Sequence, residues 1–468
     1  MRTIGVALSV LLLVSFAQAQ RRWKQNYGGS RVEMGYSVQQ TSDAGYIVTG
    51  FTTSYGAGRN DVYLIKTNTV GDTLWTRTYG GTHNDEGYSV RQTMDGGYIV
   101  AGVTASFADT LHGDIYLIKT NANGDTLWTR TYGGAVADTG YFVQQTSDGG
   151  YVVAGYTNSF GAGGYDVYVI KTNASGDTLW TRTYGGTGND YGYSVRQTPD
   201  GGYIVAGSTL SFGAGFSDVW LIRTNASGDT LWTKTYGGIY QDYGRSVWQT
   251  SDSGYVIAGY TDSYGAGGTD VYLIKTNANG DTLWTSTCGG SLFDEGLSVQ
   301  QTSDGGYITA GLTNSIDPAS YDVYLVKTNS SGDTLWTRAF DGWVYDDYGY
   351  SVQQTTDGGY IVAGFTLSDF TYYDVWLIKT DENGRLGVEE PGNSRQAAAG
   401  SMKVTPSLFT SFARIPGHEA EWFDLYDISG KWTGACRGDR VGEKLSPGVY
   451  FVSPEEAHNK AARIVKVK

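Results

Sequence analysis

Hydrophobic and polar positions repeat along most of this chain in blocks of about 52 residues. Each block holds four segments with strand character, which in the second copy are residues 88–93 (YSVRQT), 98–104 (YIVAGVT), 114–120 (DIYLIKT) and 126–133 (TLWTRTYG). Their Val, Ile, Tyr, Trp and Thr side chains favour pleated, half-buried strands. The pattern therefore predicts four strands per block, which we call the first to fourth strands.

The connections between these segments favour antiparallel order. Asp95-Gly96-Gly97 joins the first strand to the second and is typical of a tight turn with positive φ. The third strand is apolar at nearly every position, as expected for a strand covered on both faces. A glycine inside the second strand, as at Gly102, indicates that another backbone approaches closely. Four-stranded units covered on both faces are typical of propeller blades.

The number and order of the copies predict a closed ring. An Asp begins each third strand, at Asp61, Asp114, Asp166, Asp218, Asp270, Asp322 and Asp374. A period near 50 with this composition is typical of a solenoid or a propeller. The first fourth-strand tryptophan, Trp23, precedes every complete set, and the last copy ends after its third strand at Lys379. A ring explains this offset, because the N-terminal strand then becomes the outer strand of the last blade and no edge stays unpaired.

We therefore predict an all-β fold. It consists of a seven-bladed β-propeller of four-stranded antiparallel blades at residues 20–387, closed by an N-terminal outer strand, and a small C-terminal β-sandwich. The recurring phrases TYGGTGNDYGYSV and DGGYIVAG, over residues 23–380, resemble bacterial secreted β-propeller repeats. The resemblance implies this fold and an extracellular setting, and says little about a ligand.

The two ends of the chain predict export. Residues 1–19 combine a basic start, an apolar run and Ala17-Gln18-Ala19, which is typical of a secretory signal peptide and too short to span a membrane. No later stretch predicts a transmembrane segment. After a small-residue linker at 388–401, the phrases FDLYDISGK, LSPGVYFV and RIVKVK resemble the type IX secretion C-terminal sorting domain over residues 402–468, although VTPS at 404–407 replaces the family's usual Pro-Asn-Pro phrase. The resemblance implies the secretion machinery as a partner and a secreted or outer-surface location.

Charge and cysteine content limit the function classes. The chain carries 47 acidic and 33 basic residues, for a net charge of −14. Because nucleic-acid binding depends on neutralising phosphates, this balance argues against a nucleic-acid partner. The two cysteines, Cys288 and Cys436, fall in different regions and predict no disulfide framework.

Two sets of polar residues recur in every copy. Antiparallel order places the connections before the first and third strands at one end of the ring, the loop end, and the tight turns at the other, the turn end. Each connection before a first strand carries an acid, at Glu33, Asp85, Asp138, Asp190, Asp242, Asp294 and Asp347. With the Asp that begins each third strand, these carboxylates suit a cation or sugar-hydroxyl site, but repetition in every blade favours a turn-capping role.

Two neighbouring columns of the first strand are also polar. The invariant column is Gln40, Gln92, Gln145, Gln197, Gln249, Gln301 and Gln354, and the variable column before it is Gln39, Arg91, Gln144, Arg196, Trp248, Gln300 and Gln353. We expect one column to face the central channel and the other a blade interface. A hydrogen-bonded structural ring is favoured over a site.

Specificity is expected where the copies differ, and the last blade differs most. Its loops FDGWVYDDYG and SDFTYYD predict a ligand-binding site of Trp343, Tyr345, Asp346, Asp369, Phe370, Tyr372 and Tyr373. Aromatic faces and carboxylates suit a carbohydrate. The alternative is that these rings seal the closing blade or pack against the tail.

No nucleophile elbow or HExxH motif occurs, so we predict no catalytic residues, metal or cofactor. We expect a secreted, non-catalytic cell-surface binding or scaffold propeller that binds glycan or protein. The alternatives are an extracellular polysaccharide-acting enzyme, either a hydrolase or a lyase, and a purely structural surface-layer role.

Overall fold

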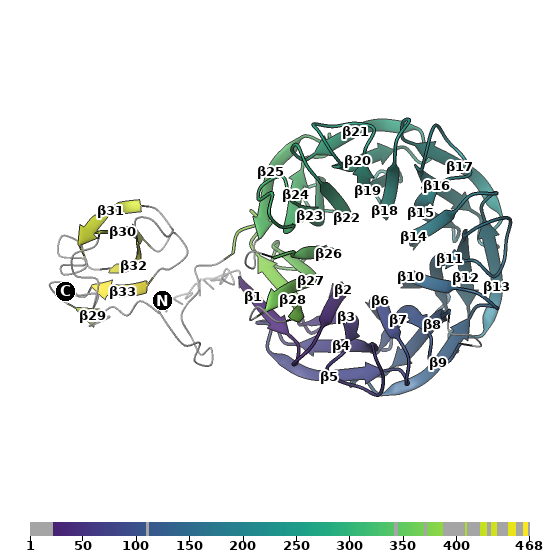
Figure 1. Ribbon diagram of the computed structural model, residues 1–468, viewed down its shortest axis with the longest axis horizontal. Helices are drawn as coiled ribbons and strands as arrows, with labels where there is room; N and C mark the ends of the chain where they lie inside the picture. The colour runs from purple at the N-terminus through teal and green to yellow at the C-terminus, as the bar shows by residue number, and fades with distance from the viewer. Residues whose placement is uncertain are drawn as a thin grey trace, which may run out of the picture. The chain divides into compact units, whose positions relative to one another are not determined.

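The computed structural model describes residues 22–108, 112–340, 345–368 and 372–386, together with the backbone of five strands in the tail. The chain separates into two compact units, residues 1–387 and 388–468. In the first unit the described strands form seven four-stranded antiparallel sheets, arranged as blades around a central axis (Figure 1). The predicted all-β, seven-bladed propeller is therefore confirmed.

Six blades are runs of four consecutive strands, numbered from the inside outwards. The first is β2 (Glu33–Gln40), β3 (Tyr46–Thr52), β4 (Asp61–Thr67) and β5 (Thr73–Tyr79). The second is β6 (Asp85–Gln92), β7 (Tyr98–Thr104), β8 (Asp114–Thr120) and β9 (Thr126–Tyr132). The third is β10 (Asp138–Gln145), β11 (Tyr151–Thr157), β12 (Asp166–Thr172) and β13 (Thr178–Tyr184), and the fourth is β14 (Asp190–Gln197), β15 (Tyr203–Thr209), β16 (Asp218–Thr224) and β17 (Thr230–Tyr236). The fifth is β18 (Asp242–Gln249), β19 (Tyr255–Thr261), β20 (Asp270–Thr276) and β21 (Thr282–Cys288), and the sixth is β22 (Asp294–Gln301), β23 (Tyr307–Thr313), β24 (Asp322–Thr328) and β25 (Thr334–Phe340).

The seventh blade joins the two ends of the propeller. It contains β26 (Tyr348–Gln354), β27 (Tyr360–Ser368), β28 (Tyr372–Thr380) and, as its outer strand, β1 (Trp23–Tyr27). Strand β1 pairs antiparallel with β28, from Trp23 opposite Lys379 to Tyr27 opposite Val375. The predicted closure by an N-terminal strand is therefore confirmed.

The tail is described only as backbone strands. They are β29 (Leu408–Phe409), β30 (Trp422–Asp427), β31 (Trp432–Arg437), β32 (Gly448–Pro454) and β33 (Ala462–Lys466). They form one sheet in the order β29-β33-β32-β30-β31, in which β29 and β33 are parallel. The β-sandwich and its sorting role stay predictions. The signal peptide at 1–19 and the linker at 388–401 lie outside the described residues.

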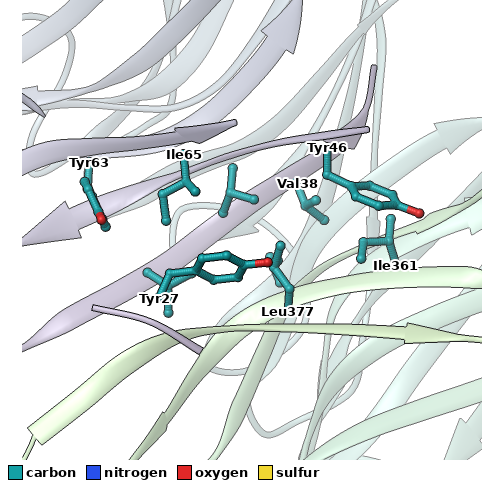
Figure 2. Packing of buried hydrophobic residues seen from close by; sticks show 10 residues of the cluster. Tyr27, Val38, Tyr46, Tyr63, Ile65, Ile361 and Leu377 are labelled. Carbon is teal, nitrogen blue, oxygen red and sulfur yellow. The ribbon is translucent and has the colours of Figure 1, made fainter. Parts of the chain in front are cut away.

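The hydrophobic core lies between blades. Seven clusters of buried residues occur among the described residues, and each combines side chains from two neighbouring blades. At the closing seam, Tyr46 and Ile65 of the first blade meet Tyr27, Ile361 and Leu377 of the seventh (Figure 2). Third strands such as β4 and β8 are buried at all seven positions, because a cluster covers each face. A blade therefore completes its core only when both neighbours are present.

The seam repeats the contacts of the other interfaces. Trp23 packs edge-on against Tyr46 with ring centroids 5.7 Å apart, as Trp75 does against Tyr98 at 5.9 Å. The Tyr27 hydroxyl donates to the carbonyl of Gly71 over 2.6 Å, and an equivalent bond joins Tyr79 to the second blade. Closure therefore uses the same chemistry as every other blade contact.

A bulge in each inner strand sets the geometry of the channel. In β6 the register shifts between Gly87 and Ser89, so the intervening Tyr88 has no partner in β7 and lines the channel. Gly102 lies opposite Gly87, and a Cβ there would be 1.8 Å from the carbonyl oxygen of Glu86. The mid-strand glycine thus allows the close backbone approach that the sequence predicted.

The structure also contains a buried cation that the apolar pattern did not predict. Lys119 in β8 is 3% exposed, and its Nζ lies 2.8 Å from Asp95 Oδ2 in the turn between β6 and β7. Partial burial raises the pKa of Asp95, but hydrogen bonds from Lys119 and Thr93 outweigh it and lower that pKa to about 2. All seven blades carry such a pair: Lys66–Asp43, Lys119–Asp95, Lys171–Asp148, Arg223–Asp200, Lys275–Asp252, Lys327–Asp304 and Lys379–Asp357.

Removing residues 22–29 tests the closure. The deletion leaves the edge of β28 unpaired and takes Trp23 and Tyr27 from the seam cluster. We expect the free energy of unfolding to fall by at least roughly 3 kcal/mol, as for the loss of a large core side chain, with aggregation following. Chemical denaturation and size-exclusion chromatography measure both effects. Gln25→Ala, on the exposed face of β1, is the control, and a deletion variant as stable as this control contradicts the closure.

Candidate functional site

The loop-end site predicted in the seventh blade is described in part. Tyr345 and Tyr372 are each 44% exposed, while Tyr373 packs edge-on against Phe365 at 4.9 Å. Asp346 Oδ1 accepts the backbone N–H of Tyr321 over 3.0 Å. Burial raises the pKa of Tyr373, and the Asp346 carboxylate adds to the rise, so the two loops lie close together. Ligand binding here stays a prediction.

Three members of that set, Trp343, Asp369 and Phe370, lie outside the described residues. Tyr373 packs against its own blade, and the Asp346 bond joins its loop to the loop before β24 of the sixth blade, which agrees with the structural alternative. Tyr345 and Tyr372 are the members with large exposed faces. Among the described residues of this set, Tyr345 and Tyr372 therefore present an accessible aromatic surface.

The repeated carboxylates at the loop end hold their own loops. Asp242 is buried, and its Oδ2 accepts the Gly238 N–H over 2.8 Å and the Ser263 hydroxyl over 2.7 Å. Asp218 Oδ2 accepts the Ala214 N–H over 2.8 Å. Burial raises the pKa of Asp218 to about 6, and the neighbouring Asp242 carboxylate adds to the rise. The turn-capping role is confirmed for these residues, and the described residues contain no group of three or more acids, histidines or cysteines that could hold a metal.

The invariant glutamines of the inner strands form a structural ring. Gln92 Oε1 accepts the Ser42 N–H over 2.8 Å, which ties β6 to the tight turn of the preceding blade. Equivalent bonds are Gln40 with Thr356, Gln145 with Met94, Gln197 with Ser147, Gln301 with Ser251 and Gln354 with Ser303. By the repeat, the position that corresponds to Ser42 for Gln249 is Pro199, which has no N–H to donate. The predicted hydrogen-bonded ring is therefore confirmed for this column.

The variable column faces a cavity of about 720 Å³ in the central channel. An aromatic belt bounds this cavity on its loop-end side. Neighbouring rings of the belt lie 5.0–5.2 Å apart, and the belt consists of Tyr350, Tyr36, Tyr88, Tyr141 and Tyr193. Arg245 continues it, with its guanidinium 4.4 Å from the Tyr193 ring. From the belt the cavity extends to the turn end, where Thr93 and Met94 line it.

Two arginines and two unusual aromatic residues occupy one side of the cavity. The Arg91 and Arg196 guanidiniums lie 4.7 Å and 4.9 Å from the Phe142 ring, and Arg196 also lies 4.3 Å from the Trp248 ring. Phe142 replaces the serine found at this position in the other six copies. Burial lowers the pKa of Arg91 to about 10, and burial and Arg91 together lower that of Arg196. Arginine side chains remain cationic in proteins, so two positive charges face this cavity.

Sequence reasoning missed this cavity because it favoured a structural role for both polar columns. The signal was present: Arg91, Phe142, Arg196, Arg245 and Trp248 all depart from the repeat on inner strands. The expectation that specificity lies where copies differ was applied to the loops of the seventh blade alone. Applied to the inner strands, the same expectation identifies the channel.

Comparisons with known proteins identify no family for the chain. No family model matches it. Over 390 residues it is 26% identical to the regulatory protein FlaEY of Caulobacter vibrioides, a match that covers 76% of this chain and 36% of that protein. The chain thus spans about a third of the length of this curated relative.

Solved structures with similar folds have diverse roles. Sqt1 from Chaetomium thermophilum is 10% identical, with a TM-score of 0.45 and coverage of 96% of this chain and 100% of its own. PorZ, a surface component of the type IX secretion system of Porphyromonas gingivalis, is 11% identical, with a TM-score of 0.41 and coverage of 95% and 60%. A polysaccharide lyase acting on ulvan is 12% identical, with a TM-score of 0.48 and coverage of 76% and 94%.

Substitution of Asp218 tests the capping role. Asp218→Ala leaves the Ala214 N–H without its acceptor, so we expect a loss of about 1–3 kcal/mol in the free energy of unfolding. Asp218→Asn keeps an acceptor and removes the charge beside Asp242, so it should cost less. Because the folded-state pKa is raised from 3.8 to about 6, the stability that the protonated carboxyl contributes is lost as pH rises through 6.

The stability of Asp218→Asn relative to the parent protein should therefore increase between pH 4 and pH 7. Chemical denaturation at both pH values measures this difference. A difference that is the same at both pH values, or an Ala variant as stable as the parent, would show that Asp218 does not work as described.

Proposed function

We propose that this chain is a secreted, non-catalytic binding propeller of the outer cell surface, and that its ligand binds in the central channel. The observation that carries the proposal is the cavity of about 720 Å³ whose wall departs from the repeat at Arg91, Phe142, Arg196, Arg245 and Trp248. This volume lies in the range of small-ligand sites. Residues that served only the ring would follow the repeat, as the invariant glutamines do.

The composition of the cavity wall supports binding rather than catalysis. Its lining residues include no Asp, Glu, His, Lys or Cys, so the serines that line it have none of these groups beside them to act as a base. The titratable groups present are arginines and tyrosines. Burial raises the pKa of Tyr36 and Tyr141 well above the ordinary value, so both stay protonated at neutral pH and are poor bases.

The loop end of the seventh blade is a second candidate contact surface. Tyr345 and Tyr372 expose their rings there, next to loops that also contain Trp343 and Phe370. We include this surface as a platform for glycan or protein. This surface lies at the loop end, whereas the cavity extends to the turn end. Substitutions in one place therefore show which of the two surfaces binds a ligand.

Export through the type IX machinery is part of the proposal. Its support is the sequence of the tail, whose phrases FDLYDISGK, LSPGVYFV and RIVKVK resemble the sorting domain, together with the signal-peptide pattern of residues 1–19. Among the described residues no helix has the length and apolarity needed to cross a membrane.

A saccharide array, read for both retention and product release, tests the function. We expect the mature chain to retain saccharide ligands without releasing products. Trp248→Gln should weaken retention by roughly 1–3 kcal/mol, the range of an interface anchor. Gln occupies the same position in other blades, and because Trp248 also packs against a cluster between blades, the melting temperature of the variant is measured alongside. Tyr372→Ala is the matched loop-end variant.

The outcomes of this experiment are distinct. Loss of retention in Tyr372→Ala but not in Trp248→Gln would move the ligand to the loop end. Release of shortened or unsaturated products would overturn the non-catalytic role in favour of a hydrolase or a lyase. If no saccharide on the array is retained, the binding role is overturned in favour of a structural surface-layer role.

Deleting residues 402–468 tests the role of the tail. In a host with type IX secretion, we expect the truncated chain to accumulate in the periplasm, because the sorting signal is lost. The propeller should keep its melting temperature, because residues 1–387 form a compact unit with its own seven hydrophobic clusters. Cell fractionation and thermal melting measure the two effects, and normal surface delivery of the truncated chain would contradict the proposed role.

A further inference from the structure

The charge of the channel cavity is opposite to that of the chain. The whole chain has 47 acidic and 33 basic residues, yet the cavity is lined by Arg91, Arg196 and Arg245 and by no Asp or Glu. None of the three arginines forms a salt bridge with a carboxylate among the described residues, in contrast to the buried Lys119 with Asp95. Of the three arginines, only Arg245 has a pKa that a carboxylate, Glu295, helps to raise. Arg91 and Arg196 therefore bring two unbalanced positive charges to the cavity.

The glutamines of the variable column add further hydrogen-bond donors. Gln39 Oε1 accepts the Gln92 N–H over 2.6 Å, and because a backbone N–H can only donate, the atom facing it must be the amide oxygen. The amide NH₂ group of each of these side chains is then available to donate hydrogen bonds to a ligand. The same arrangement holds for Gln144 with Gln197, Gln300 with Gln354 and Gln353 with Gln40. At this level the wall therefore offers mainly donors.

Two buried polar atoms at the cavity have no hydrogen-bond partner among the described residues. They are Ser194 Oγ, on a residue 1% exposed, and Arg245 Nε. In other blades the equivalent serine accepts a backbone N–H of the next blade, as Ser37 does from Val90. Leaving buried polar atoms unpaired is costly, and an acceptor supplied by a ligand would remove that cost.

The two arginines bring like charges close together. Both guanidiniums lie over the same Phe142 ring, and the attraction to the ring and bonds to the carbonyls of Val90 and Val247 offset part of their repulsion. The fold does not require them, since four of the seven blades have glutamine at this position. Charged residues that the fold does not require, and that no carboxylate pairs, are typical of binding sites.

We propose that the cavity binds an acidic saccharide, whose carboxylate or sulfate group is held between Arg91 and Arg196. This inference rests on the proposed binding function and names the ligand class of the same site. Guanidinium groups form strong charge-assisted bonds to such oxyanions. The cavity is much larger than one inorganic anion, and its amides, hydroxyls and aromatic faces suit the hydroxyl and C–H groups of a sugar.

The test compares acidic saccharides with neutral counterparts. The probes are a panel of uronate and sulfated trisaccharides, each paired with its methyl-esterified or unsulfated form, titrated calorimetrically into the mature full-length chain. We expect one or more acidic members to bind at least about tenfold more tightly than their neutral partners, which corresponds to about one charge-assisted hydrogen bond. Raising the salt concentration should reduce this preference.

The variants are Arg91→Gln and Arg196→Gln, which introduce the residue that other blades already use. Each should weaken acidic ligands about tenfold, and the double variant should bind acidic and neutral forms equally. Their melting temperatures should equal or exceed that of the parent, because a like-charge contact is removed. The control is Arg182→Gln, an arginine that likewise lies over a tryptophan, Trp180, but on the outer strand β13.

Each other outcome overturns part of the account. Equal binding of acidic and neutral forms, unchanged in the Gln variants, overturns the anion inference and leaves the binding function intact. Acidic preference that survives the double variant overturns the assignment to Arg91 and Arg196. Gln variants that melt below the parent show that the arginines serve the fold. Sulfate ion that binds as tightly as the sulfated trisaccharide overturns the saccharide class, and absence of binding by every probe overturns both the inference and the binding function.

Discussion

A four-stranded blade with two apolar faces cannot bury both of them alone, and the rest of this structure depends on that constraint. Every described hydrophobic cluster is shared by two blades, so each blade needs two neighbours and the row of blades must close. Strand β1 completes the ring by giving the seventh blade its outer strand and the seam its Trp23 and Tyr27. Ring closure therefore provides the core that a single large hydrophobic centre provides in other folds.

Much of this architecture could be predicted from the sequence because repetition makes the physical signals redundant. The seven copies, the glycine opposite each bulge and the offset between first and last strands together specified the blades and their closure. The buried Lys119 could not be predicted in the same way, because its partner Asp95 is distant in sequence and is brought to it only by the paired strands. The sequence predicted that one of the two polar columns faces the channel but not which one, because the bulge at Tyr88 and its equivalents decides this.

Residues that hold the ring together and residues that differ between blades occupy different positions in the repeat. Positions that hold the ring keep the same chemical group around it, as the invariant glutamines do and as the loop-end carboxylates do, with Glu33 among six aspartates. Departures on the inner strands, at Arg91, Phe142, Arg196 and Trp248, come together on one side of the channel although they span blades two to five. A rigid ring allows such substitutions because the buried residues of the clusters between blades carry its stability, and of these departures Phe142 and Trp248 also pack against a cluster from the channel side.

The central claim is that these departures form a binding site for an acidic ligand. The most direct measurement is a crystal structure of the mature chain with a bound acidic trisaccharide from the panel. The account predicts the carboxylate or sulfate oxygens at about 2.7–2.9 Å from the guanidiniums of both Arg91 and Arg196, with the sugar between the tyrosine belt and the turn end. A ligand seated instead beside Tyr372 at the loop end, or a channel that stays empty at saturating ligand, would contradict it.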